Sequence, residues 1–304
     1  MACWWEGSPI VSCMLHASIA TLAAGQHAES VNLFQAVIYG IVQGLTEFLP
    51  VSSTAHVRIV PALFGWPDPG AAFTAVIQLG TTLAIVLYFW RELLHIAIAW
   101  ARGMFSDKTI RESLEYRMGW YLIVATIPVS VAGLALSHQI ETGARNLWLI
   151  AITLIAMAVV LLVAEVIGSR KRDEEQINTT DAVWVGTAQA LALIPGASRS
   201  GTTITAGLLR GMDRPTAARF SFLLSIPAVV ASALFEARHI GDKGTVGTGF
   251  IGVAAILAFI VGLASIAWLM RWITRHSTYV FIAYRVALGL LLIGLLAGGT
   301  IKAT

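Results

Sequence analysis

The chain has 304 residues, of which 57% are hydrophobic and only 12% are charged. Its mean hydropathy is +0.77. Soluble domains usually carry about 25% charged residues, so this composition excludes an ordinary water-soluble domain. The formal net charge is only +3, and we expect no nucleic acid among the partners. Several stretches of about 18 or more residues are almost free of charge, which predicts an all-α polytopic membrane protein surrounded by membrane lipids.

In chain order, residues 1–30 form an N-terminal extension to which the sequence assigns no role, and 31–304 form a single membrane domain. Two apolar segments, at about 33–66 and 181–212, are interrupted by Pro, Gly and clustered polar residues. Broken backbone is tolerated at membrane depth only where protein or water covers it, so both segments are predicted to be re-entrant helix–loop–helix hairpins. Six transmembrane helices are predicted at about 72–90, 118–136, 147–167, 216–236, 249–270 and 279–298.

Positive charges are distributed unevenly between the two sides of this topology. One side collects 13 of the 20 Lys and Arg residues, whereas the other collects five. Cytoplasmic loops are enriched in Lys and Arg, so the richer side is predicted to be cytoplasmic and both termini are predicted to lie outside. The first hairpin then enters from outside and the second from the cytoplasm. The richer side comprises the loops at about 91–117, 168–180 and 271–278, together with Arg210, Arg214 and Arg219.

The two predicted hairpins resemble each other in sequence. "AVIYGIVQGL" (36–45) aligns with "AVWVGTAQAL" (182–191) at an offset of 146 residues, and Ser52 matches Ser198 at the same offset. Because the hairpins enter from opposite faces, this pattern indicates an inverted-topology repeat. In such proteins the functional site lies where the repeats meet. Repeat 1 is expected at about 31–136 and repeat 2 at about 177–298.

The first hairpin contains a concentrated group of polar side chains. Gln43 and Glu47 are one helical turn apart and therefore share a face. A carboxylate at membrane depth is costly, so we favour a functional role for Glu47 over that of a buried structural partner. Pro50 ends the helix, and a hydroxyl beyond it can serve purely as a cap of the next helix. The turn and the following helix carry Ser52, Ser53, Thr54 and His56, and the candidate substrate-binding residues are Gln43, Ser52 and Thr54.

The second hairpin contains "PGASRSGTT" (195–203) ahead of an apolar helix. Backbone N–H groups at a helix N-terminus, together with nearby hydroxyls, can form a cradle for an anion. Arg199 adds a permanent planar cation suited to phosphate oxygens. The alternative is an Arg199 that reaches an interface while its serine neighbours only cap the helix. The other candidate substrate-binding residues here are Gly196, Ser198, Ser200, Gly201, Thr202 and Thr203.

The two hairpins supply complementary chemical groups. The first offers a carboxylate, hydroxyls and an imidazole, and the second offers a guanidinium beside a phosphate-sized cradle of N–H groups. We expect Glu47 and Arg199 to meet inside the membrane and form a site for phosphoryl chemistry on a lipid-borne phosphate. A lipid substrate explains the depth, because its headgroup can enter the cavity while its tail stays in hydrocarbon.

The motifs "QGLTEFLPVSSTAH" and "PGASRSGTT" resemble those of the undecaprenyl-pyrophosphate phosphatase family, also called BacA or UppP, and the resemblance covers about residues 31–300. It implies hydrolysis of the terminal phosphate of an isoprenyl pyrophosphate lipid, which regenerates the carrier lipid for peptidoglycan synthesis and gives bacitracin resistance. It also implies a divalent cation, Mg²⁺ or Ca²⁺. The implied location is the bacterial plasma (inner) membrane, with the active site facing the periplasm or exterior.

The family's (E/Q)xxxE motif falls on Gln43 and Glu47, which the resemblance implies as metal-binding residues. Its serine and histidine fall on Ser53 and His56, and the implied catalytic residues are Glu47, Ser53, His56 and Arg199. The Gln at position 43 leaves a single carboxylate here, which counts against a mechanism with two anionic metal ligands. Ala55 also stands where many members of the family have Gly.

Several alternatives remain open. Ser53 can attack phosphorus with His56 as proton acceptor, or a water molecule activated by the cation can attack directly. His56 can also be a hydrogen-bonded packing residue. Discontinuous helices in an inverted repeat are the architecture of secondary transporters, so a lipid-phosphate flippase or anion transporter is the alternative function. A second copy of the chain, forming a homodimer, is also a candidate partner, because the sequence does not define the oligomeric state.

Overall fold

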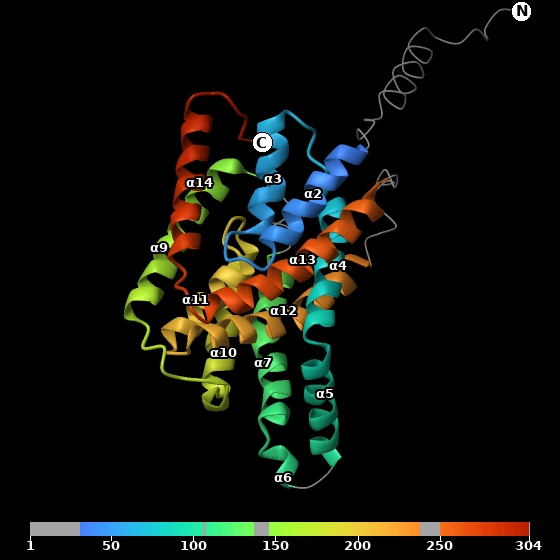
Figure 1. Cartoon of the computed structure of the whole chain (residues 1–304), viewed down its shortest axis with the longest axis vertical. Coiled ribbons are helices and arrows are strands. Elements are labelled where there is room, and N and C mark those ends of the chain that lie inside the picture. Colours follow the sequence, from blue (N-terminus) through green and yellow to red (C-terminus); the bar gives the residue numbers. More distant parts are fainter. Residues whose placement is uncertain (1–30, 106–107, 137–145, 238–249, 304) are drawn as a thin grey trace, which may run out of the picture.

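The computed structural model describes residues 31–105, 108–136, 146–237 and 250–303, and in these ranges the chain is helical with no β-strand (Figure 1). The all-α prediction is therefore confirmed. One isolated parallel β-bridge joins Arg172 to Met212. The predicted extension over 1–30 lies outside the described residues.

Both predicted hairpins consist of two helices separated by a short loop. The first comprises α2 (Leu33–Thr46) and α3 (Ser53–Phe64). The second comprises α10 (Thr179–Ala190), a 3₁₀ turn η2 (Leu191–Leu193) and α11 (Arg199–Leu209). Helices also cover all six segments predicted to span: α4 (Gly70–Tyr88), α7 (Leu114–Ala135), α9 (Leu147–Ile167), α12 (Arg214–Ala237), α13 (Ile251–Ile273) and α14 (Tyr279–Ala297).

Four of these helices, α7, α9, α13 and α14, are long and apolar enough to cross a membrane. A fifth crossing is obtained if Phe73–Tyr88 is joined to the next helix, α5 (Trp90–Phe105), across a bend of 74°. The expectation of a cytoplasmic loop over 91–117 was wrong in its structure, because most of that segment forms α5 and the short α6 (Lys108–Arg111). In Figure 1, α5 and α7 run side by side beyond the rest of the bundle.

The first helix of each hairpin begins in the same way. Asn32 caps α2 in a reciprocal capping box with Gln35, whose amide oxygen accepts from Asn32 N–H. Asn178 caps α10 in the same arrangement with Asp181, and it lies 146 residues after Asn32. Such boxes satisfy two backbone donors that a helix start leaves without partners. The sequence offset therefore corresponds to a structural equivalence.

The first helices also pack on their neighbours in an equivalent way. Helix α2 packs against α13, and α10 packs against α7. A Cβ on Gly40 would lie 2.5 Å from the carbonyl oxygen of Ala254, and one on Gly186 would lie 2.3 Å from that of Ala125. Real Cβ atoms do not approach so closely, so glycine is required at both positions for the helix backbones to touch. Helices α9 and α14 pack against each other.

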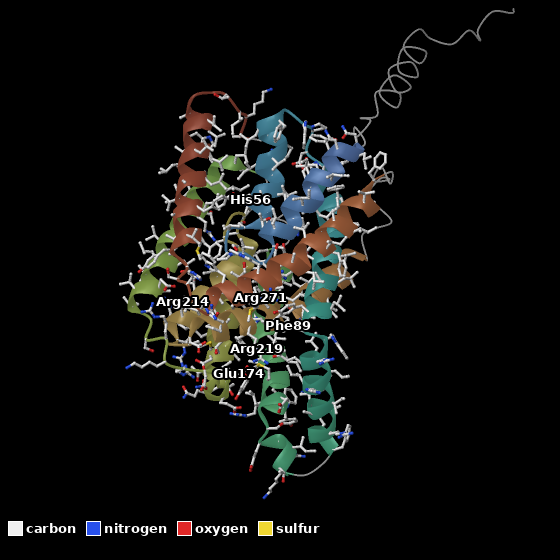
Figure 2. All side chains as sticks on the ribbon, in the orientation of Figure 1. His56, Phe89, Glu174, Arg214, Arg219 and Arg271 are labelled. Carbon is white, nitrogen blue, oxygen red and sulfur yellow. The ribbon has the colours of Figure 1, made fainter. Side chains whose placement is uncertain are left out.

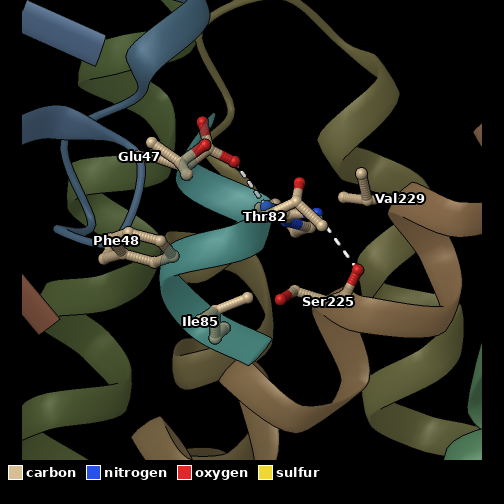
Figure 3. A pocket seen from close by; sticks show the side chains of 8 residues that line it. Glu47, Phe48, Thr82, Ile85, Ser225 and Val229 are labelled. Carbon is tan, nitrogen blue, oxygen red and sulfur yellow. Dashed lines mark hydrogen bonds and ion pairs between the residues drawn. The ribbon is translucent and has the colours of Figure 1, made fainter. Parts of the chain in front are cut away.

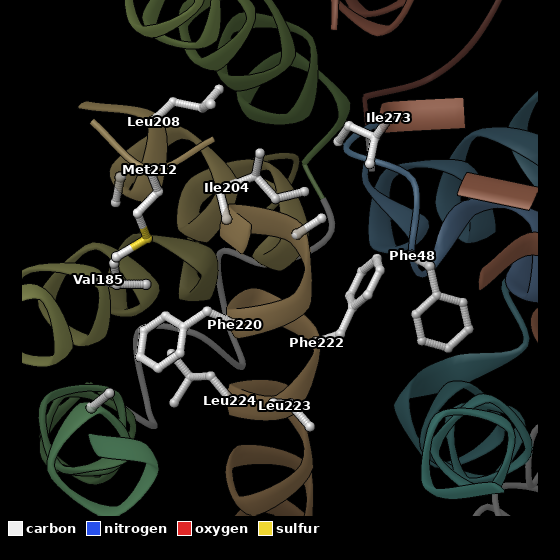
Figure 4. Packing of buried hydrophobic residues seen from close by; sticks show 14 of the residues in the cluster. Phe48, Val185, Ile204, Leu208, Met212, Phe220, Phe222, Leu223, Leu224 and Ile273 are labelled. Atoms are coloured by element: carbon white, nitrogen blue, oxygen red, sulfur yellow. The ribbon is translucent and has the colours of Figure 1, made fainter. Parts of the chain in front are cut away.

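The largest hydrophobic cluster joins the second hairpin, α12 and the loop of the first hairpin (Figure 4). Phe48 of that loop lies edge-on to Phe222 of α12, with ring centroids 5.8 Å apart. Aromatic pairs in this geometry add about 0.5–1.5 kcal/mol beyond their buried area. Because Phe48 follows Glu47 directly, this packing helps to fix the position of the loop that carries the Glu47 carboxylate.

Candidate active site

Glu47 lies at the centre of a hydrogen-bonded group that joins both hairpins. It follows the last residue of α2, and only 9% of its surface is exposed. Its Oε2 accepts hydrogen bonds from Gln43 Nε2 at 2.9 Å and from Ser53 Oγ at 2.5 Å. Its Oε1 forms an ion pair with Nη2 of Arg199, the first residue of α11. The loop after α2, which carries Glu47, and the start of α11, which carries Arg199, therefore meet, as expected from the sequence.

These side chains border a cavity of about 190 Å³ between the two hairpins, α4, α7 and α12. At the side of the cavity formed by α12, Arg199 also donates to the backbone oxygen of Ser225 at 3.4 Å, near Thr82 of α4 (Figure 3). Helix α4 contributes Thr74 and Gln78 to the cavity wall. The predicted site residues that line it are Gln43, Glu47, Ser52, Ser53, Thr54, Gly196, Ser198 and Arg199.

Ser52 and Ser198 are equivalent residues with the same unusual backbone. Their φ angles are 75° and 72°, in a region that side chains other than glycine rarely adopt. Each serine is the N-cap of the second helix of its hairpin, and its Oγ accepts from the backbone N–H three residues later, in Ala55 and Gly201. Backbone strain of this kind costs about 1–3 kcal/mol and clusters at functional sites.

Four predicted residues at the start of α11 do not line the cavity. Ser200 donates to the carbonyl oxygen of Leu49 at 3.0 Å, which ties this helix to the loop of the first hairpin. The hydroxyls of Thr202 and Thr203 both donate to the carbonyl oxygen of Arg199, at 2.9 and 2.8 Å. Gly201 is buried, and a Cβ there would lie 2.8 Å from Nη1 of Arg285.

His56 does not line the cavity and takes part in a separate set of contacts. Its Nδ1 lies 2.7 Å from the carbonyl oxygen of Ser52, and its Nε2 lies 2.6 Å from the Tyr284 hydroxyl. A carbonyl oxygen only accepts, so Nδ1 carries a proton, and in the neutral imidazole Nε2 accepts from the Tyr284 hydroxyl. Figure 2 places His56 in the half of the bundle that contains α3, apart from the charged group around Arg214 and Arg219. In this arrangement the partner of the Ser53 hydroxyl is Glu47.

Arg285 of α14 was not identified from the sequence, although it holds both loops. Its guanidinium donates to the carbonyl oxygens of Pro50, Gly196 and Ala197 at 3.0–3.1 Å, and to that of Leu154 at 3.2 Å. None of these four hydrogen bonds goes to a carboxylate. The signal was present, because Arg285 is the single charged residue within Tyr279–Ala297, and an ionisable residue within an apolar span marks a candidate site.

Two fully buried carboxylates, Glu165 of α9 and Asp181 of α10, lie away from the cavity and were also missed. Each is neutralised by two arginines, so both are structural partners in this fold. The hydrogen bond to Asp181 raises the pKa of Arg172 above its usual value. The ion pairs are Glu165 with Arg170 and Arg214, and Asp181 with Arg172 and Arg210.

The cavity fits a divalent cation only together with a substrate. Among the described residues, no group of three or more His, Cys, Asp or Glu side chains surrounds a common point. Glu47 is the one carboxylate that the described part of the chain places on the cavity wall, and Gln43 beside it donates through Nε2, which makes its amide oxygen the atom suited to a cation. Mg²⁺ is commonly held by one or two carboxylates plus substrate phosphates and water, so this donor set fits that mode.

Comparison with known proteins agrees with the motifs. A family model described as "Bacitracin resistance protein BacA" matches residues 36–291. A Nocardioides protein named undecaprenyl-diphosphatase is 48% identical over 274 residues, which is 90% of this chain and 100% of the relative. A protein of the same name from Chlorobaculum tepidum is 49% identical over 278 residues, covering 88% of this chain and 98% of the relative.

Proposed function

Because the chain belongs to the bacitracin resistance protein BacA family, we propose that it is an undecaprenyl-diphosphatase, an integral membrane hydrolase. It removes the terminal phosphate of undecaprenyl diphosphate and releases undecaprenyl phosphate and inorganic phosphate. This reaction recycles the lipid carrier used in peptidoglycan synthesis. It also lowers the amount of diphosphate lipid available to bacitracin, in agreement with the family's description.

The observation that carries this proposal is the contact between Glu47 and Arg199 at the wall of one cavity. These residues are 152 positions apart in the chain and come from different hairpins. A guanidinium binds phosphate oxygens in a planar, bidentate manner, and a carboxylate can accept a proton or bind a cation. The same cavity therefore contains groups for holding a diphosphate and for activating a nucleophile.

We propose that Glu47 is the general base of the reaction. Its Oε2 already accepts the hydrogen bond of Ser53, and a hydrogen bond between nucleophile and base is the arrangement that activates a serine. In the serine route, the Ser53 oxygen bonds to phosphorus, its proton passes to Glu47, and undecaprenyl phosphate leaves with the bridging oxygen. A water molecule then hydrolyses the phosphoserine, which releases inorganic phosphate and restores the Ser53 hydroxyl. In the alternative route, a water molecule at the same position loses its proton to Glu47. Arg199 stabilises the charge on the transferred phosphoryl group in both routes.

A Mg²⁺ or Ca²⁺ ion held by Glu47, Gln43 and the diphosphate would supply additional charge neutralisation at the phosphates. Its coordination by phosphate oxygens agrees with the small number of protein ligands at the cavity. The role left for His56 is positioning. Its contacts with Ser52 and Tyr284 hold the start of α3, which carries Ser53.

The proposed topology has six transmembrane helices and two re-entrant hairpins, with repeat 1 at about 31–136 inverted relative to repeat 2 at about 177–298. The equivalent capping boxes, strained serines and closely packed glycines support the repeat. The distribution of Lys and Arg supports an orientation in the plasma (inner) membrane with the site open to the periplasm or exterior.

The direct test is phosphate release from undecaprenyl diphosphate by the purified protein in detergent, with and without EDTA. We expect release that depends on the divalent cation. Ser53→Ala then separates the two routes, because a covalent route requires the Ser53 oxygen. A loss of at least about 1,000-fold in kcat supports serine attack, and near-normal turnover supports water attack.

The equivalent hairpins also agree with the architecture of secondary transporters, so a lipid-phosphate flippase or anion transporter is the second candidate. The phosphate assay separates the two functions, because a transporter moves its substrate without cleaving it. Absence of phosphate release from undecaprenyl diphosphate under all cation conditions would contradict the proposed diphosphatase.

A further inference from the structure

Gln189 of α10 is a buried polar residue whose amide has no partner. Its side chain is fully buried, at 0% exposure, and neither Nε2 nor Oε1 forms a hydrogen bond within the described structure. An unsatisfied buried polar group costs about 1–3 kcal/mol, and almost all such groups in folded proteins have a partner. The residue also lies at the wall of the cavity that contains Glu47 and Arg199.

The repeat explains why this amide is unpaired. Gln189 lies 146 residues after Gln43, whose amide donates to Glu47 one turn further along the same helix. The residue one turn after Gln189 is Leu193, which has no acceptor. The second hairpin therefore retains the glutamine but lacks the carboxylate that satisfies its counterpart. A leucine at 189 would fill the same space without leaving two polar atoms unpaired.

We propose that Gln189 is a further binding residue for the phosphate groups of the substrate, an inference that rests on the proposed function. Its Nε2 donates to a non-bridging phosphate oxygen, while its Oε1, which only accepts, takes a hydrogen bond from a water molecule bound beside that phosphate. Because both atoms are closed off in this conformation, the side chain turns toward the cavity when the headgroup enters. The charged ligand then supplies the partners that the protein lacks.

The test compares Gln189→Leu with the wild type in two independent measurements. If the amide binds only substrate, the leucine variant keeps or raises the midpoint of thermal unfolding in detergent, because it removes two unsatisfied groups. Its kcat/KM for undecaprenyl diphosphate falls about 10- to 100-fold, the value of one hydrogen bond to a charged group. Gln189→Glu should lower kcat/KM further than Gln189→Leu, since it replaces the donor with a negative charge.

Thr187→Val is the matched control, because Thr187 lies on the same helix, is exposed, and donates only to the carbonyl oxygen of Val183. It should leave kcat/KM unchanged. Wild-type kcat/KM in Gln189→Leu would overturn the proposal, since an amide satisfied by a structural water has no role in binding. Unfolding of both Gln189→Leu and the longer Gln189→Met would also overturn it, since the amide would then be required by the fold.

Inorganic pyrophosphate separates this inference from the proposed function. It can be titrated into the protein by calorimetry whether or not the lipid is cleaved. We expect Gln189→Leu to weaken its binding by about 10-fold or more relative to wild type and Thr187→Val. If the wild type binds pyrophosphate but releases no phosphate from the lipid, the proposed function fails and the role of Gln189 is still measured. Equal pyrophosphate binding by wild type and Gln189→Leu rejects the role of Gln189 alone.

Discussion

The two hairpins share three local backbone features but carry different chemical groups. Both begin with an asparagine capping box, both bring a glycine against a neighbouring helix, and both turn through a strained serine. At the offset of 146, however, Glu47 corresponds to Leu193, and Ser53 corresponds to Arg199. One hairpin therefore carries the carboxylate and the hydroxyl, and the other carries the guanidinium. The equivalent hairpins therefore differ in the side chains at their loops, which is where they meet.

The largest effect should come from breaking the contact between the two halves. Glu47→Gln and Arg199→Gln should each lower kcat/KM for undecaprenyl diphosphate by about 100- to 1,000-fold or more, because each removes a group to which the proposed mechanism gives a role in the transition state. The double variant should be little worse than either single one, because residues acting as a unit are not additive. Phosphate release measures all three.

A matched control for this ion pair is Glu92→Gln, which breaks the pair with Arg219 at 2.8 Å, away from the cavity. Its kcat/KM should stay within a few-fold of wild type. Activity close to that of the wild type in Glu47→Gln would contradict the role of Glu47 as base.

Arg285 tests whether the two halves need a common support. Arg285→Met removes four hydrogen bonds and leaves buried carbonyl oxygens of both loops without a donor. We expect a loss of about 2 kcal/mol or more in stability, measured as the change in free energy of unfolding, together with a fall in kcat. Arg285→Lys keeps the charge but not the planar arrangement of donors, so its stability and kcat should lie between those of the wild type and Arg285→Met. Full stability and kcat in Arg285→Met would show that the loops hold their positions without it.

The smallest effect concerns the shared backbone. Gly40→Ala and Gly186→Ala should each destabilise the protein by about 1–3 kcal/mol through overpacking, with kcat of the folded fraction nearly unchanged. Gly133→Ala on α7 is the control, because a Cβ there meets no atom within 4 Å. It should be neutral or stabilising by up to about 1 kcal/mol, the helix propensity of alanine over glycine. A large effect at only one of the two paired glycines would weaken the structural equivalence of the hairpins.

The helices over the six apolar segments and the two broken hairpins were predictable, because hydropathy and clustered Pro and Gly mark them directly. Helix α5 was not, since Arg91, Glu92 and Arg102 interrupt the apolar run and gave the segment the appearance of a loop. A helix with charged residues at its membrane end can continue beyond an apolar span, and hydropathy alone does not distinguish it from a connection.

At the site, the grouping of Glu47, Ser53 and Arg199 was predictable because their motifs are dense and match the family. The directions in which the threonine hydroxyls point were not predictable. Thr202 and Thr203 donate to the helix backbone, a common use of threonine inside a helix that sequence spacing cannot separate from ligand binding. His56 faces Tyr284, 228 residues away, and a partner so distant in the chain is visible only in the folded molecule.

The three donors around Glu47 have a consequence for how a headgroup binds. With Arg199, Gln43 and Ser53 all directed at one carboxylate, the charges of Glu47 and Arg199 neutralise each other at the cavity wall. In the proposed mechanism, an incoming diphosphate competes for the Arg199 guanidinium, so its association is an exchange of one anion for another rather than a simple addition. Some of the attraction is used to separate the internal pair, which limits affinity. The same exchange helps inorganic phosphate, the smaller product, to depart, because the Glu47 carboxylate pairs again with the Arg199 guanidinium.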